Sequence, residues 1–229
     1  MKKLLLIIAV TSATMWSQAQ VIFAVQSPAS IEGNYAFSWA DPAGGWGSPN
    51  FNIPGTFVEG DLMIVDDGST GLNPQGNPVS AEGCNPLVND LAGKIAFIYR
   101  NTCEFGDKAF NAEAAGAIGV VIVNREPEVI EMGAGAQGSA VTIPVAFVSS
   151  VTGALMLAEM ANGPVNVFFG NKTGLFADDA GVTTAASLIS KSYGTPIQLS
   201  QNATEFNFEV GTRVYNYGTN NQTNVSVTA

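Results

Sequence analysis

The stretch that decides the fold is residues 91–124, LAGKIAFIYRNTCEFGDKAFNAEAAGAIGVVIVN. A nearly continuous apolar strand is predicted over residues 94–99, after a turn at Ala92-Gly93. A second apolar run, rich in β-branched residues, follows at residues 118–123. Strands that are apolar throughout are buried on both faces, as in the middle of a parallel sheet.

A short helix is predicted between these two strands, over residues 107–115. Asp107 can cap its start, and Ala109, Ala112 and Ala115 recur at helical spacing. Gly116 is placed to end the helix in a left-handed conformation. The small alanine face would let the helix backbone approach a sheet closely.

The pattern then repeats. A strand is predicted over residues 143–148, where Pro144 must sit at the first residues or on an edge. Ser149 or Ser150 caps a second helix that runs to about Met160. A further strand at residues 165–169 completes the order strand, helix, strand, strand, helix, strand.

The flanking segments are also β-like. A short strand over residues 61–65 ends in the turn Asp66-Asp67-Gly68. After Gly170 the composition shifts, and alternation returns at residues 206–210, 214–217 and 224–229. We expect a linker from residue 176 and, from about residue 185, the opening strands of a second, incomplete β-sandwich.

The middle of the chain resembles the protease-associated (PA) domain family. The residues that carry the resemblance are Gly83-Cys84, residues 91–98, residues 100–105 (RNTCEF), Lys108-Ala109, Asn111-Ala112, residues 115–117 (AGA), residues 119–124 (GVVIVN) and residues 143–148 (IPVAFV). The match spans roughly residues 25–170. One departure is Asn101, where the family usually has glycine.

The resemblance implies an α+β, mostly β fold: a PA-type β-sandwich or open barrel with two short flanking helices, occupying residues 20–175. It also implies a role. PA domains are accessory modules of secreted or luminal peptidases and of sorting receptors. They are linked to the binding of substrates or partners and are not known as catalysts.

The first nineteen residues are typical of a signal peptide. Lys2 and Lys3 precede an apolar run over residues 4–10, and cleavage is expected between Ala19 and Gln20. We therefore expect a secreted or cell-surface protein, with no membrane span. In an oxidising compartment an even cysteine count favours one disulfide, between Cys84 and Cys103.

The charge disfavours nucleic acids and anionic membranes as partners. Nine basic and nineteen acidic residues give a net charge of −10. Removal of residues 1–19, which hold two of the basic residues and no acidic one, leaves −12. Such a charge repels phosphate backbones and anionic lipid.

Catalytic and metal-binding sets are scarce in this sequence. Histidine is absent, which removes Ser-His-Asp and Cys-His nucleophile systems and the His-Glu-x-x-His zinc site. Two acidic pairs, Asp66-Asp67 and Asp178-Asp179, are interpreted first as turn residues and second as a weak Ca²⁺ site. No other cofactor or metal is expected.

The functional prediction is a non-catalytic module that binds a peptide or protein, such as a linked peptidase or its substrate. Its predicted contacts lie in the turn at residues 100–104 and the loop at residues 124–138, in particular at Arg100, Asn101, Glu104, Asn124 and Arg125. Two alternatives stay open. The chain is the front part of a secreted peptidase with its catalytic domain beyond Ala229, or it is a structural β-domain protein of the cell surface.

Overall fold

The structure is a computed structural model that describes residues 20–188 and 211–226. The predicted signal peptide and the strand predicted at residues 206–210 lie outside these residues. The strands are β1 (Val21–Ser27), β2 (Gly33–Asn34), β3 (Phe37–Trp39), β4 (Phe57–Ile64), β5 (Ile95–Tyr99), β6 (Gly119–Val123), β7 (Val145–Val148), β8 (Asn166–Asn171), β9 (Ala180–Leu188) and β10 (Gly211–Asn216). The helices are α1 (Phe105–Ala114) and α2 (Ser150–Met160), with 3-10 turns η1 (Pro42–Gly44), η2 (Val79–Glu82) and η3 (Gly138–Ala140).

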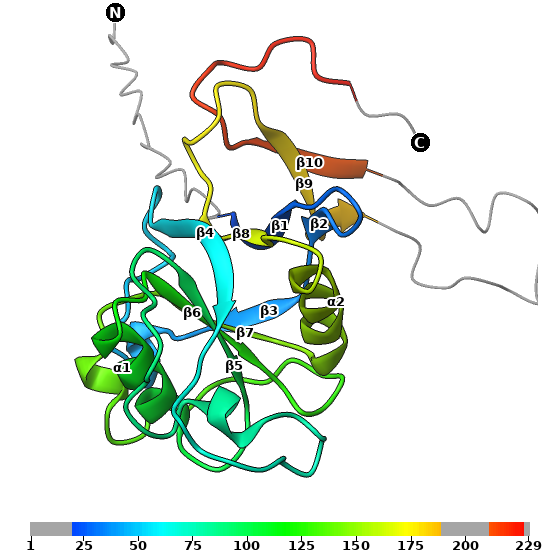
Figure 1. Cartoon of the computed structure of the whole chain (residues 1–229). Coiled ribbons are helices and arrows are strands. Elements are labelled where there is room, and N and C mark those ends of the chain that lie inside the picture. The colour runs from blue at the N-terminus through cyan, green and yellow to red at the C-terminus, as the bar shows by residue number, and fades with distance from the viewer. Residues whose placement is uncertain (1–19, 189–210, 227–229) are drawn as a thin grey trace, which may run out of the picture.

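Strands β1 to β8 form one curled sheet in the order β2-β1-β8-β4-β5-β6-β7-β3 (Figure 1). This confirms the mostly β fold with two helices, in its open form. The predicted succession of strands and helices is also confirmed, as β5-α1-β6-β7-α2-β8. Strands β4, β5, β6 and β7 pair in parallel, whereas β1, β3 and β8 pair antiparallel to their neighbours.

The parallel strands are buried on both faces, as their continuous apolar sequence predicts. Phe97 and Val121 point into one core cluster, which they share with Phe169 of β8. Ile98 and Ile122 alternate with them and point into the second cluster, against Ala109 of α1. Because side chains alternate along a strand, one apolar run serves two cores.

Helix α1 begins two residues earlier than predicted. Its N-cap is Glu104, whose side chain makes no capping hydrogen bond, and Asp107 lies in the first turn. The prediction of Asp107 as the cap is therefore wrong. The Glu104 carboxylate does not bond to the helix, because it accepts from the backbone N–H of Ala136 at 2.9 Å. The predicted C-terminal glycine is confirmed, since Gly116 has a φ of 90°.

Strand β4 starts at Phe57, four residues before the predicted start at Asp61. It changes partner along its length: residues 57–61 pair with β8 and residues 62–64 with β5. The apolar pattern of this strand is interrupted at Glu59, Gly60 and Asp61. The alternation of apolar and polar residues therefore does not indicate the first half of the strand.

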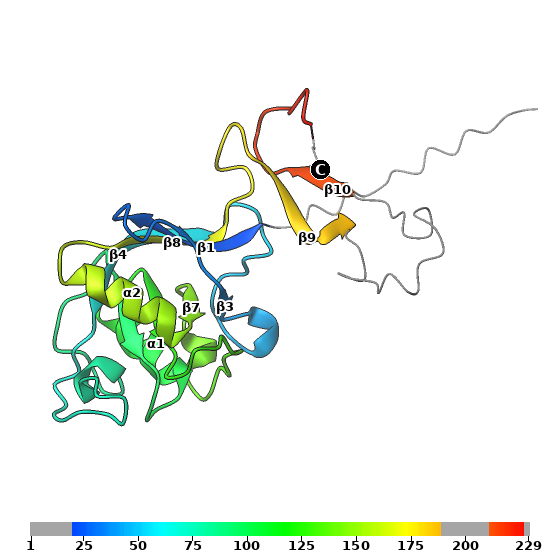
Figure 2. The ribbon, with the colours of Figure 1, turned by 90° about the vertical axis from the view of Figure 1, so that its right-hand side faces the viewer.

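Strands β9 and β10 form a separate two-stranded antiparallel sheet. Figure 2 shows this pair beside the larger sheet and not within it. The strand predicted at residues 214–217 is found at residues 211–216, whereas residues 224–226 are not a strand as predicted. The division into a domain at residues 20–175 and a second, incomplete one remains a prediction. Neither α1, α2 nor any other described helix has the length and apolarity that crossing a membrane requires.

The cap of α2 gives a test of local energetics. Ser149 is the N-cap, and its Oγ accepts from the N–H of Thr152 at 3.1 Å. Replacing Ser149 by alanine removes this bond and should lower the free energy of unfolding by about 1 kcal/mol. Ser150→Ala is the matched control, because no side-chain hydrogen bond of Ser150 is present and little change is expected. Urea unfolding of both variants measures the difference, and equal losses would contradict the assignment.

Candidate binding cleft

The carboxyl ends of the parallel strands bring predicted contact residues to one edge of the sheet. Arg100 follows β5 and Asn124 follows β6. The backbone N–H of Arg100 donates to Val123 O at 2.8 Å, which continues the pairing of β5 with β6. Arg100 therefore lies beside the end of β6, which Asn124 follows. In open sheets with parallel strands, ligands bind outside this end of the strands.

A cleft of about 310 Å³ lies at this edge. One wall is the turn that leads from β5 into α1, and the other is the glycine-rich loop before β7. The residues that line it are Arg100, Asn101, Cys103, Glu104, Phe105, Gly133 and Gly135. The bond from Ala136 N–H to the Glu104 carboxylate joins the two walls.

Arg100 is held at this site from two sides. Its guanidinium donates to Asn124 Oδ1 at 2.9 Å and lies 5.6 Å from the centre of the Phe105 ring. Burial lowers the pKa of Arg100, and the neighbouring charge of Arg125 acts in the same direction. No carboxylate lies within salt-bridge distance of Arg100 among the described residues. Arg100 therefore lines the cleft without a direct ion pair, although the charge of Glu126 raises its pKa against the effect of burial.

The predicted contact residues divide into two groups. Arg100, Asn101 and Glu104 line the cleft. Asn124 is only 3% exposed and positions Arg100, while Arg125 is exposed and lies outside the lining. Asn101 needs no glycine-like backbone, because its φ is negative, and its amide donates to Gln75 Oε1 at 3.0 Å. Phe105 is a lining residue that was not singled out from the sequence, and only its place beside the predicted turn pointed to it.

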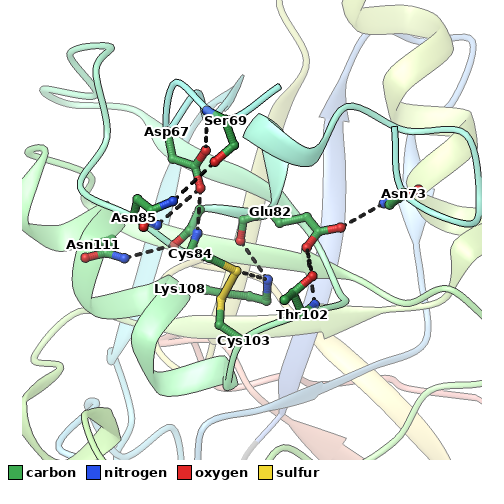
Figure 3. Close-up of a disulfide and its surroundings, with 11 residues drawn as sticks. Asp67, Ser69, Asn73, Glu82, Cys84, Asn85, Thr102, Cys103, Lys108 and Asn111 are labelled. Atoms are coloured by element: carbon green, nitrogen blue, oxygen red, sulfur yellow. Dashed lines mark hydrogen bonds between the residues drawn. A yellow bond between two sulfur atoms is a disulfide. The ribbon is translucent and has the colours of Figure 1, made fainter. Parts of the chain in front are cut away.

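The disulfide between Cys84 and Cys103 is present. It joins the loop after η2 to the turn that forms one wall of the cleft. Figure 3 shows the polar groups around it. Lys108 and Glu82 are both 0% exposed, and Lys108 Nζ donates to the backbone carbonyl of Glu82 at 2.7 Å.

This buried charged cluster was not predicted from the sequence. Burial lowers the pKa of Lys108 to about 8, against the opposing effect of the charges of Glu82, Asp67 and Asp107. The carboxylate of Glu82 accepts from Thr102 N–H and Oγ1–H at 3.2 and 2.8 Å, and from Asn73 Nδ2 at 3.1 Å. The one sequence feature that pointed to a buried charge was Lys108, which lies beside the alanine face of the predicted helix.

Asp67 organises the backbone between β4 and the disulfide. Its carboxylate accepts from the N–H groups of Ser69, Cys84 and Asn85 at 3.0, 2.9 and 3.1 Å. Asp66 caps its own turn by accepting from Gly68 N–H. These bonds account for the acidic pair as turn residues, and the weak Ca²⁺ site stays a prediction. The described residues contain no group of three or more His, Cys, Asp or Glu that could hold a metal ion.

Acid should destabilise this region. Burial alone would raise the pKa of Asp67 and of Glu82, but their hydrogen bonds, and for Glu82 the charge of Lys108, lower both overall. A carboxyl whose pKa is lower in the folded state than in the unfolded chain adds stability above its unfolded pKa and loses it on protonation. We expect the free energy of unfolding to fall from about pH 5 downward. Urea unfolding across this range measures it, and Asp67→Asn should flatten the profile; an unchanged profile in the variant would contradict the assignment.

Three comparisons relate the chain to known proteins. The family model described as PA domain matches residues 58–156. Signal peptide peptidase-like 2 of Arabidopsis thaliana is 43% identical over 51 residues, which cover 22% of this chain and 9% of the relative. Aminopeptidase YwaD of Bacillus subtilis is 41% identical over 64 residues, or 28% of this chain and 14% of the relative.

Among solved structures, an aminopeptidase from Aneurinibacillus sp. strain AM-1 aligns with a TM-score of 0.45 and 21% identity, covering 66% of this chain and 30% of that one. The two curated relatives are thus matched over 9% and 14% of their length. The similarity concerns a module within longer proteins.

Proposed function

Because residues 58–156 of this chain are a PA domain, we propose that the chain is the peptide- or protein-binding module of a secreted protein and accompanies a peptidase without cutting the peptide itself. The observation that carries this proposal is the cleft at the carboxyl end of β5. It brings together Arg100, Asn101 and Glu104, three residues that were predicted from the sequence to contact a partner.

The chemistry of the cleft suits an extended peptide. Arg100 and Asn101 offer N–H donors to peptide carbonyl groups, and the face of Phe105 offers apolar contact. Gly133 leaves the opposite wall without a side chain, and a Cβ there would meet no atom within 4 Å, so a peptide backbone can approach closely. Polar groups placed in a partly apolar depression are what peptide recognition requires.

Two features support a non-catalytic role. The sequence has no histidine, and its two cysteines are joined in a disulfide, so the usual nucleophile systems lack a base and a thiolate. The matched relatives include an aminopeptidase of more than six times the matched length, which favours the module as an accessory to a peptidase. The disulfide and the predicted signal peptide together support secretion.

Selection from a displayed peptide library tests the proposal. The full secreted chain should enrich a set of related peptides, and mass spectrometry should find these peptides uncut after incubation. Arg100→Ala should lower affinity for the enriched peptides by about tenfold or more, because truncating a central arginine contact removes well over 1 kcal/mol. The matched control is Arg213→Ala, an exposed arginine on β10.

The outcomes separate cleanly. Enrichment with a selective loss in Arg100→Ala supports the cleft as the binding site. Equal binding by the wild type and Arg100→Ala would contradict the cleft, and cleavage of the peptides would contradict the accessory role.

A further inference from the structure

The two sulfur atoms of the disulfide have different electrostatic surroundings. Lys108 Nζ lies 3.6 Å from Cys84 Sγ, within hydrogen-bond range for sulfur, and donates to no atom of Cys103. The lysine is 0% exposed and also bonded to Glu82 O. Figure 3 shows the ammonium group against the Cys84 side of the bond.

Other charged groups face this pair. The Asp67 carboxylate accepts from the N–H of Cys84, the Glu82 carboxylate is engaged by Thr102 and Asn73, and Asp107 lies on α1. All three are negative and oppose a thiolate. The Asp67 and Glu82 carboxylates bind N–H and O–H groups and not the sulfur, whereas the ammonium of Lys108 is in direct contact with Cys84 Sγ, where screening by water is weakest.

Cys103 has a weaker source of stabilisation. It lies just before Glu104, the N-cap of α1. A helix N-terminus stabilises a nearby anion only weakly at an exposed position, and the charge of Glu104 opposes it there. A buried ammonium in contact has the larger effect, so Cys84 is the sulfur that better carries a negative charge.

We propose that the Cys84–Cys103 disulfide is a directional thiol-exchange site, at which a thiol reductant attacks Cys103 and Cys84 leaves as a thiolate against Lys108. In the first step, the thiolate of the reductant forms a bond to Cys103 Sγ, the Cys84–Cys103 bond breaks, and its electron pair stays on Cys84. In the second step, the second thiol of the reductant, as its thiolate, attacks the reductant sulfur of the mixed disulfide. The reductant closes into a disulfide, and Cys103 leaves as a thiolate that takes up a proton. Two electrons pass from the dithiol to the protein.

Access and leaving-group chemistry favour the same direction. Both cysteines are half-buried, and of the two Cys103 is the one that lines the cleft, through which a reductant can approach it. Exchange is faster when the departing thiol has the lower pKa, and the contact with Lys108 gives Cys84 that property. The product of the first step places a mixed disulfide in the wall of the cleft and frees that wall from the loop after η2.

Glutathione is the probe that tests this direction, because a monothiol has no second thiol in the same molecule to complete the reduction. The wild-type chain is treated, quenched with an alkylating reagent and mapped by mass spectrometry. The expected result is glutathione on Cys103 with the alkyl group on Cys84. Glutathione on Cys84 in equal or greater amount would overturn the proposal.

A variant tests the part played by Lys108. Lys108→Met keeps an unbranched side chain that is one atom shorter and removes the charge, so both mixed disulfides should form in similar amounts. Lys94→Met is the matched control, since Lys94 pairs with Asp61 at 2.9 Å, and should keep the wild-type preference. An unchanged preference in Lys108→Met would overturn the role of the lysine.

A second measurement needs no change at Lys108. In Cys103→Ser, Cys84 is the remaining thiol, and its alkylation rate is followed against pH. A midpoint below the ordinary thiol pKa of about 8.5 is expected, and a midpoint at or above that value would overturn the proposal.

Discussion

Glu82→Ala is expected to lower the free energy of unfolding by about 1–3 kcal/mol, the cost of leaving buried hydrogen-bonding groups without their partner. Glu82 is 0% exposed and holds Thr102 and Asn73 by three hydrogen bonds. Its loss leaves the donors of both residues without this acceptor and removes the negative charge that most raises the pKa of Lys108. Urea unfolding of the oxidised chain measures the change.

Glu59→Ala is the matched control for this substitution. Glu59 is exposed on β4, and no side-chain hydrogen bond or ion pair of this residue is present. Its replacement should change the free energy of unfolding by no more than about 0.5 kcal/mol. A similar small change for Glu82→Ala would show that the buried cluster does not hold the loop beside the disulfide.

Gly106→Ala is expected to separate the two walls of the cleft. A Cβ atom at this position would lie 2.1 Å from Ala134 O and 2.5 Å from Gly138 N, both backbone atoms. Neither can turn away as a flexible side chain would, so α1 and the glycine-rich loop must move apart. Overpacking of this kind costs about 1–3 kcal/mol, and peptide binding should fall with it.

Gly133→Ala is the control in the same loop, because a Cβ there meets no atom within 4 Å and its φ is not in the left-handed region. We expect this variant to unfold as the wild type does. Unfolding curves of both variants check the effect on stability, and binding to a library-selected peptide is compared between Gly106→Ala and the wild type. Wild-type binding by Gly106→Ala would mean that contact between the walls is not needed.

The parts of the fold that followed from sequence are those with a local cause. The strands at residues 95–99 and 119–123 are apolar throughout, and Ser149 is a strong capping residue before an apolar run. The start of α1 was predicted wrongly, because the carboxylate of its N-cap, Glu104, accepts a hydrogen bond from a loop residue thirty-two positions away. Sequence spacing carries no trace of such a contact.

The candidate site divides in the same way. Arg100 and Asn101 could be placed because they follow a buried strand, where parallel strand ends meet. Asn124 was predicted to contact the ligand, but it is buried and positions Arg100 instead. Its burial depends on the neighbouring strand and loop, which the sequence alone does not place. The Lys108–Glu82 cluster could not be predicted, because burial of two charged residues requires partners distant in sequence.

NMR mapping of a bound peptide tests directly whether the cleft is the binding site. The chain labelled with ¹⁵N is titrated with a peptide selected from the library, and the backbone amide shifts are followed. We predict that the largest changes fall at residues 100–105 and 133–138, on both walls of the cleft. Changes centred on the exposed apolar face of α2, at Val151 and Leu155, with the cleft unaffected, would contradict the proposed site.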